Sequence, residues 1–297
     1  MEILLQEDTN KFAIYHTIYT DSNIFLRFDW NERVEDTIDC ITNSKAYFLY
    51  DHDKILGGFV LKGNIINYPF VITPFDDIQK FLEIVLKFVI EKSGQNKIIL
   101  NEISDAFSHV LVQKYGATLK WSKRKMVKPT EKYSPVLDKN FCFDILAIKD
   151  KAEIIKVIYE AHSVGYTSTV WKPDIVEIET AVERRFNSFG QTNTLYMSNV
   201  VRNIEKNETV GVCIAGIYPD SEKYSTGKFS TIHQISVKPQ YQRRGIAKAM
   251  ILKSISEANK VSPVMTLGVL VGNPAEIFYR DIGFSIGPSY SELVYSE

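Results

Sequence analysis

The sequence lacks several features that mark common classes of protein. Its formal net charge is −1, so it has no general electrostatic field to attract nucleic acid or an anionic membrane. Its three cysteines, Cys40, Cys142 and Cys213, form no C-x-x-C pair, which argues against a disulfide framework and against a zinc site. We therefore expect no metal, no nucleic-acid partner and no membrane partner.

Long apolar runs and nucleotide-binding loops are also missing. The first residues are acidic and have no apolar signal core, and the most apolar predicted helix, Phe81 to Ile90, is interrupted by Glu83 and Lys87. These features predict a cytoplasmic protein. Neither G-x-G-x-x-G nor G-x-x-x-x-G-K-[ST] occurs in the 297 residues, which argues against the usual dinucleotide and nucleoside-triphosphate loops.

The most informative stretch of the sequence runs from Gln234 to Met250. It begins as a short apolar strand, Pro239 ends that strand, and Gly245 precedes apolar residues at helical spacing. A helix N-terminus has backbone N–H groups without intrahelical partners and a partial positive charge. A strand that leads into a glycine turn and a helix therefore predicts an anion-binding site.

Full charges surround the same turn. Arg243, Arg244 and Lys248 are basic, and Gly245 lets a ligand approach the backbone because it has no Cβ atom. Phosphate is the anion that this arrangement suits best. The alternative is an exposed basic helix start that binds no ligand.

The segment Gln242-Arg-Arg-Gly-Ile-Ala247 resembles the acyl-CoA signature of the GNAT superfamily of N-acetyltransferases, Q/R-x-x-G-x-G/A. The resemblance is strong over residues 141–297 and only architectural over residues 1–127. It implies acetyl-CoA as co-substrate, with the pantetheine arm and acyl carbonyl held by the backbone of the strand. The implied cofactor contacts are Ile235, Ser236, Val237, Gln242, Arg243, Arg244, Gly245, Ile246, Ala247, Lys248 and Asn273.

A second segment, Asn273 to Phe284, resembles another GNAT signature, N-x-x-A-x-x-L-Y-x-x-x-G-F, shortened by one residue near its start. In the family, its tyrosine donates a hydrogen bond to the leaving sulfur, which gives that role to Tyr279. The alternative is that Tyr279 is an aromatic residue of the core. Asn273 followed by Pro274 is also an ordinary helix start, so Asn273 has a structural interpretation beside the cofactor contact.

His233 is the predicted general base. Strand alternation predicts that Thr231, His233, Ile235 and Val237 share one face, directed toward the cleft. Arylalkylamine members carry a similar histidine there, whereas Thr231 stands where histone-type members carry a catalytic glutamate. An imidazole is mostly neutral at pH 7 and can accept the proton of an amine. A structural histidine is the alternative interpretation.

The segment Gly165 to Lys172 joins two predicted helices where family members shape the acceptor pocket. Tyr166 and Trp171 are therefore candidate substrate-binding residues. Packing between domains explains the same two aromatic residues equally well.

Landmarks recur in the same order in the two halves of the chain. The pairs are Lys54 to Gly57 with Glu208 to Gly211, Pro74 with Pro239, Gly116 with Gly283, and Met126 with Leu293. This order indicates an internal repeat. We expect a degenerate GNAT-like domain at 1–130, a linker at 131–140 and a catalytic domain at 141–297.

The first copy lacks the functional residues. Asp76 and Asp77 stand where the second copy has arginine, and carboxylates repel a pyrophosphate. Val112 occupies the place of Tyr279. We therefore expect one CoA for each chain.

The sequence thus predicts an α/β protein, more closely an α+β GNAT fold, of two tandem domains, each a mixed, mostly antiparallel sheet flanked by helices. The expected activity is acetyl transfer from acetyl-CoA to a primary amine of a small molecule or peptide, by direct attack on the thioester. A monomer or homodimer is expected. The alternative function is a non-catalytic acyl-CoA sensor.

Overall fold

The computed structural model describes residues 1–20, 30–170, 172, 174–217 and 229–297. They form two compact units. The first unit comprises Met1–Arg124 together with Pro288–Glu297, and the second comprises Lys125–Gly287. Two strands, β6 (Thr118–Pro129) and β12 (Ser285–Ser296), each contribute residues to both units.

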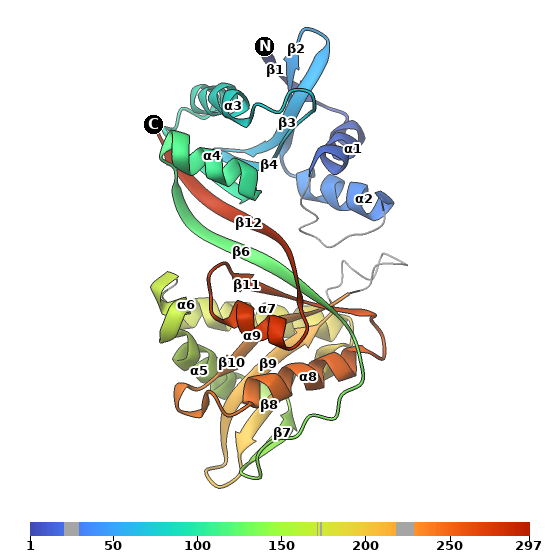
Figure 1. The fold of residues 1–297 in the computed structure, drawn as a ribbon, viewed down its shortest axis with the longest axis vertical. Coiled ribbons are helices and arrows are strands. Elements are labelled where there is room, and N and C mark those ends of the chain that lie inside the picture. Colours follow the sequence, from blue (N-terminus) through green and yellow to red (C-terminus); the bar gives the residue numbers. More distant parts are fainter. Residues whose placement is uncertain (21–29, 171, 173, 218–228) are drawn as a thin grey trace. The chain divides into compact units, whose positions relative to one another are not determined.

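The first unit is a mixed sheet with the strand order β1-β2-β3-β4-β5-β12 (Figure 1). Its pairs are antiparallel except β4 and β5, which run parallel. Its other strands are β1 (Glu2–Gln6), β2 (Lys45–Asp51), β3 (Lys54–Lys62), β4 (Ile65–Val71) and β5 (Lys97–Ile103). Its helices are α1 (Thr9–Tyr19), α2 (Trp30–Ile41), α3 (Ile78–Ser93) and α4 (Asp105–Tyr115).

The second unit repeats this arrangement with the strand order β7-β8-β9-β10-β11-β6, and β10 and β11 are its parallel pair. Its other strands are β7 (Phe141–Ile145), β8 (Asn199–Asn203), β9 (Glu208–Gly216), β10 (Ser230–Val237) and β11 (Val264–Leu270). Its α-helices are α5 (Lys151–His162), α6 (Gly165–Val170), α7 (Ile175–Gln191), α8 (Ile246–Ala258) and α9 (Ala275–Asp281). The mixed sheets with flanking helices confirm the predicted fold class.

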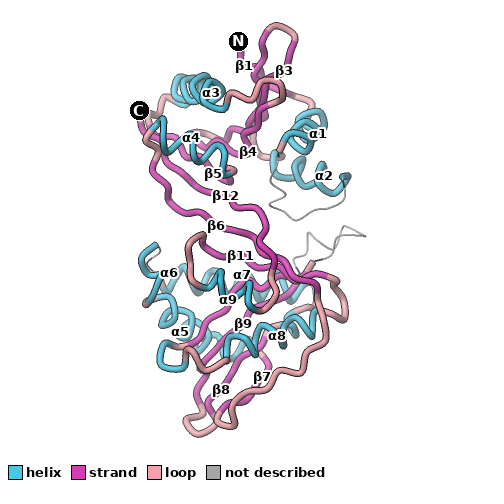
Figure 2. Tube along the Cα trace, in the orientation of Figure 1, coloured by secondary structure: helices cyan, strands magenta, loops and turns pink. Residues whose placement is uncertain are grey.

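Helices cover both faces of each sheet, as Figure 2 shows for the separate units. Along β2, Tyr47 packs in the core beneath α3 and α4, while its neighbour Phe48 packs in the core that contains Phe12 of α1. This alternation follows from the two-residue period of a strand. Within the described ranges, no helix is both long and apolar enough to cross a membrane.

The glycine landmarks of the repeat have a common physical cause. A Cβ atom on Gly57 would lie 2.9 Å from the Phe81 ring of α3, and one on Gly211 would lie 2.9 Å from the Met250 side chain of α8. Both glycines therefore let a helix approach the centre of its sheet closely. The structure thus confirms an internal repeat at the level of the packed elements.

The C-terminal strand differs from the expected domain ranges. The prediction assigned residues 141–297 to one domain, but Pro288–Glu297 belong to the first unit, where Leu293 pairs with Leu100 of β5. Leu293 is fully buried in the core of that unit. An alternating apolar strand can complete either sheet, so the sequence of β12 alone does not predict which strand it pairs with.

We predict that Leu293→Ala destabilises the protein by about 2–5 kcal/mol, because it opens a cavity in a packed core. Leu119→Ala is the matched control, since Leu119 also lies in a strand but is 48% exposed. Urea unfolding followed by fluorescence measures both variants. Equal midpoints for the two variants would show that β12 does not complete this core.

Candidate functional site

The site is built around the place where β10 and β11 separate. Their parallel pairing is confined to Ser230–Ile232 with Met265–Leu267. Beyond Ile232, β10 continues to pair with β9 up to Val237, so its other edge turns toward an opening in the sheet. A sheet that splits in this way leaves backbone groups of an edge strand available to a ligand that runs alongside it.

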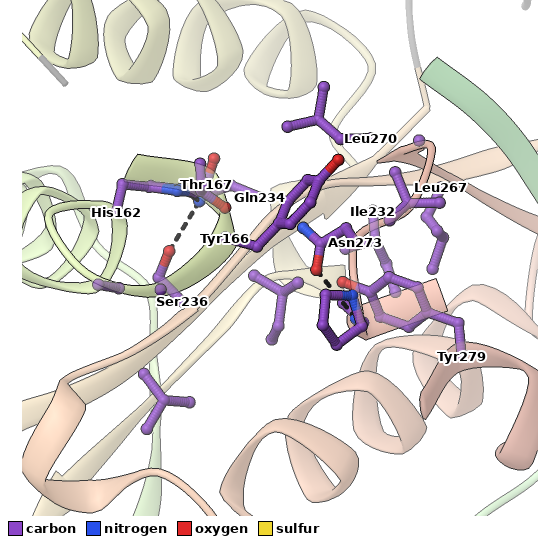
Figure 3. A pocket seen from close by; sticks show the side chains of 18 of the residues that line it. His162, Tyr166, Thr167, Ile232, Gln234, Ser236, Leu267, Leu270, Asn273 and Tyr279 are labelled. Atoms are coloured by element: carbon purple, nitrogen blue, oxygen red, sulfur yellow. Dashed lines mark hydrogen bonds between the residues drawn. The ribbon is translucent and has the colours of Figure 1, made fainter. Parts of the chain in front are cut away.

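A cavity of about 440 Å³, which we call the β10–β11 cavity, occupies this opening (Figure 3). It is lined along β10 from Ile232 to Val237 and along β11 from Leu267 to Leu270. Helices α5, α6 and α9 contribute His162, Tyr166 and Tyr279. The cavity therefore receives side chains from elements on both faces of the sheet.

The structure corrects the predicted alternation of β10. The register with β9 shifts between Ile232 and Gln234, which is a β-bulge at His233. Ile232 and Ile235 consequently pack in the same core, whereas His233 is exposed and lines a cavity of about 70 Å³ against α5 and α7. Thr231, His233, Ile235 and Val237 thus do not share a face, because the bulge inserts one residue into the period of two. His233 still lines the β10–β11 cavity.

Tyr279 lies on α9 with 7% of its surface exposed, and it lines the β10–β11 cavity. Burial raises the pKa of its phenol, with a smaller contribution from Cys213. The phenol therefore keeps its proton at neutral pH and can act as a hydrogen-bond donor. Its ring packs against Phe278 and Phe284, so the core interpretation and the donor interpretation are compatible.

Asn273 precedes helix α9, and its Oδ1 accepts a hydrogen bond at 2.9 Å from the backbone N–H of Ala275, the first residue of that helix. It also lines the β10–β11 cavity, near Tyr279 in Figure 3. Tyr166 lines the same cavity, and its hydroxyl donates to the carbonyl of Val271 at 2.8 Å. Of the two aromatic residues predicted to bind substrate, Trp171 lies outside the described residues.

A partly buried ion pair holds the turn that follows β10. Lys238 donates to Glu208 at 3.0 Å, and the Tyr241 hydroxyl donates to the other oxygen of the same carboxylate. The hydrogen bond from Tyr241 and then that from Lys238 lower the pKa of Glu208, so the carboxylate stays ionised. This cluster fixes the chain before the glycine turn to the edge of β9.

The glycine turn has the geometry of an open helix start. Gly245 is the N-cap of α8 with φ of 76°, and no side chain caps this helix. Arg243 before it also has a positive φ, of 62°. Because the first N–H groups of a helix have no intrahelical partners, the turn presents donors to an anion.

A groove of about 720 Å³, which we call the α8 groove, lies over this turn. Arg243, Lys248 and Asp281 are its charged lining residues, and the Arg244 guanidinium instead lies 5.6 Å from the centre of the Tyr241 ring. The β10–β11 cavity and the α8 groove share Val237 and Gln242 among their lining residues. The α8 groove therefore adjoins the β10–β11 cavity.

Several predicted cofactor residues direct their side chains into the protein. Ile246 is buried in the core, and Ser236 is buried with its hydroxyl bonded to Gln234. Gln242 donates to the carbonyl of Val237 at 3.0 Å. These residues offer mainly their backbone groups to a ligand, although Gln242 and Ile246 line the α8 groove as Ala247 and Lys248 do.

The sequence prediction missed His162 and Gln234. Gln234 Nε2 lies 2.7 Å from His162 Nε2 and 2.7 Å from Ser236 Oγ. Burial lowers the pKa of His162, and the hydrogen bond from Gln234 opposes that shift less strongly. Their only sequence signal is a polar residue in an apolar strand and a histidine at a helix end.

The described residues of the first unit differ from the second unit at the corresponding places. Its helix α3 is capped by Asp77, whose carboxylate accepts from the N–H of Lys80 at 2.9 Å. The register pairs of β4 and β5 end at Asn67 and Asn101, and the next residues, Tyr68 and Glu102, both have positive φ. Burial, followed by the charge of Glu102, raises the pKa of Tyr68. Polar side chains of the protein thus lie where the second unit has its cavity.

Comparison with protein-family models matches residues 199–286 to the acetyltransferase (GNAT) domain. These residues form a GNAT domain. The match includes β10, the glycine turn, α8 and Tyr279, which contribute to the β10–β11 cavity or to the α8 groove. A search of curated protein sequences finds no match.

Solved structures extend the similarity of fold to the whole chain. A GCN5-related N-acetyltransferase from Sphaerobacter thermophilus has a TM-score of 0.65 at 12% identity, over 99% of this chain and 95% of that one. A tandem GNAT protein from the clavulanic acid biosynthesis pathway has a TM-score of 0.57 at 7% identity, over 99% and 98%. A GNAT-family acetyltransferase from Colwellia psychrerythraea has a TM-score of 0.54 at 11% identity, over the full length of both.

At these identities the similarity shows the fold, which is the predicted tandem GNAT fold. The GNAT domain supports acyl transfer from acyl-CoA to an amine as the general activity of the chain.

We predict that the chain binds one equivalent of CoA and that Gly245→Asp abolishes this binding. Aspartate tolerates a positive φ, and its charge repels a pyrophosphate at the helix start. Gly63→Asp is the matched control, because Gly63 also has a positive φ and open space around it. Calorimetric titration that gave two equivalents, or unchanged binding to Gly245→Asp, would contradict a single site at α8.

Proposed function

We propose that this protein is an acetyl-CoA-dependent N-acetyltransferase that acts on a primary amine of a small molecule or a peptide. The observation that carries the proposal is that the β10–β11 cavity adjoins the α8 groove. Val237 and Gln242 line both the cavity and the groove. One extended ligand with a phosphate-bearing part and an acyl-bearing part suits this shape.

The chemistry of the lining fits acyl-CoA. The open start of α8, with Arg243 and Lys248, suits the pyrophosphate, because oriented N–H dipoles and full positive charges act together there. Asp281 offsets part of that charge. The free edge of β10 at Ile235 to Val237 suits the amide groups of pantetheine, which can hydrogen-bond as an added strand does.

Tyr279 is the proposed donor to the leaving sulfur. Its raised pKa keeps the phenol protonated, and its position in the β10–β11 cavity places it beside the separating strands. A donor whose proton is retained until negative charge develops on sulfur stabilises the products of C–S cleavage. His233 stays a prediction for the proton acceptor, since it lines the same cavity on the bulge.

Tyr166 is proposed to line the acceptor side of the cavity, beside Thr167 from the same helix. Among the residues that the structure describes, those that line the β10–β11 cavity include no aspartate, glutamate, lysine or arginine. Such a lining offers the ammonium form of the acceptor no counter-ion, so it favours the neutral amine that attacks the thioester.

A panel of primary amines, small and peptide-borne, tests the proposal with purified protein and acetyl-CoA. We expect thiol release above the rate of hydrolysis for at least one class of amine. The competing function, a non-catalytic acyl-CoA sensor, predicts CoA binding without amine-dependent thiol release across the panel. The GNAT domain favours the enzyme over the sensor.

We predict that Tyr279→Phe lowers kcat by about 10-fold to 1,000-fold with little change in CoA affinity, because it removes a donor needed when the thiolate leaves. Tyr196→Phe is the control, since Tyr196 is 42% exposed and does not line either hollow. Steady-state kinetics with calorimetry of CoA binding separates the two effects. Unchanged kcat in Tyr279→Phe would show that Tyr279 is a residue of the core and not a donor to the leaving sulfur.

A further inference from the structure

His162, at the end of α5, lines the β10–β11 cavity together with Tyr279. Its Nε2 atom lies 2.7 Å from the amide nitrogen of Gln234, and that nitrogen also donates to Ser236 Oγ at 2.7 Å. Figure 3 shows His162, Gln234 and Ser236 gathered on one side of the cavity. Three polar side chains from two elements thus form a connected set inside the reaction site.

The β-bulge of β10 creates this set. Without the extra residue at His233, the period of two would place Gln234 on the same face as Ile232, which packs in the core beneath α8. The register shift instead turns Gln234 toward α5, where it meets His162. Bulges commonly re-aim a side chain beside an active site.

The surroundings of His162 favour its neutral form. The titratable and charged groups that line this cavity and the adjoining small cavity are Tyr166 of α6, Glu177 and Arg185 of α7, His233 of β10 and Tyr279 of α9. Glu160 lies on its own helix. Burial is the larger influence on the pKa of His162, which it lowers, and the hydrogen bond from Gln234 opposes that shift. A neutral imidazole can accept a proton.

We propose that His162 is the catalytic base of the reaction and that Gln234 is its positioning residue. The inference rests on the proposed N-acetyltransferase function. The acceptor ammonium loses one N–H proton to the imidazole, which passes it to solvent. The neutral nitrogen forms the C–N bond, and the C–S bond breaks with its electron pair on sulfur, where Tyr279 donates a hydrogen bond to the thiolate. The second nitrogen proton, lost as the amide forms, passes to the thiolate and gives the free thiol.

Gln234 positions the neutral imidazole. Its amide N–H can only donate, so its contact with Nε2 selects the neutral tautomer that carries its proton on Nδ1 and has its lone pair on Nε2. Proton transfer then requires the acceptor N–H to replace the Gln234 N–H at Nε2, while Gln234 can keep its hydrogen bond to Ser236. This assignment replaces the prediction that His233, which is exposed on the bulge, is the base.

The test is the pH profile of kcat/KM for His162→Ala with an amine that the wild type acetylates. We expect a loss of about 100-fold to 1,000-fold near pH 7 that shrinks as the pH approaches the amine pKa near 10, where the acceptor deprotonates unaided. CoA affinity should be unchanged, and imidazole added to the medium should restore part of the activity. Gln234→Leu should lower kcat and move the acid limb of the profile.

His162→Gln is a second variant that keeps a polar side chain beside Gln234, and it should show the same pH-dependent loss. His109→Ala, an exposed histidine of α4, is the control that should leave the profile unchanged. An equal loss at every pH, or a pH-dependent loss in His233→Ala with His162→Ala unaffected, would overturn the assignment. A wild type that acetylates no amine would instead overturn the proposed function itself.

Discussion

The separation of β10 from β11 is the constraint on which the rest of the second unit depends. The strands pair through Ile232 and Leu267 and then part, while β10 remains held by β9 on its other edge. The opening exposes one strand edge to a ligand and lets α5, α6 and α9 bring polar side chains into a sheet that is otherwise packed on both faces. The ion pair of Lys238 with Glu208 then fixes the direction in which the chain leaves β10, toward the open start of α8.

The two units show how the same framework gains or loses a ligand site through few residues. At the helix that follows the parallel strand, Gly245 leaves α8 uncapped, whereas the Asp77 carboxylate satisfies and neutralises the start of α3. At the separating strands, the second unit has a cavity and the first has Tyr68 and Glu102. We propose that capping and side-chain volume decide which copy can accept an anionic cofactor.

Features that depend on local spacing could be predicted from the sequence. The strand, the break at Pro239, the turn at Gly245 and the following helix are encoded within residues 234–258, and α8 forms there. Features that depend on contacts between residues far apart in the sequence could not be predicted from it. The bulge at His233 changes which face each side chain occupies, the contact of Gln234 with His162 joins residues 72 positions apart, and the end of β12 pairs with β5 of the first unit. None of these has a period or motif that marks it.

Hydrogen–deuterium exchange with and without acetyl-CoA tests the central claim most directly. The first N–H groups of α8 have no intrahelical partners and should exchange quickly until a phosphate accepts their hydrogen bonds. We predict that acetyl-CoA slows exchange at residues 243–248 and along β10 from residue 233 to residue 237, and leaves residues 73–80 before and within α3 unchanged. Protection confined to residues 73–80, or no protection at the start of α8, would contradict the account.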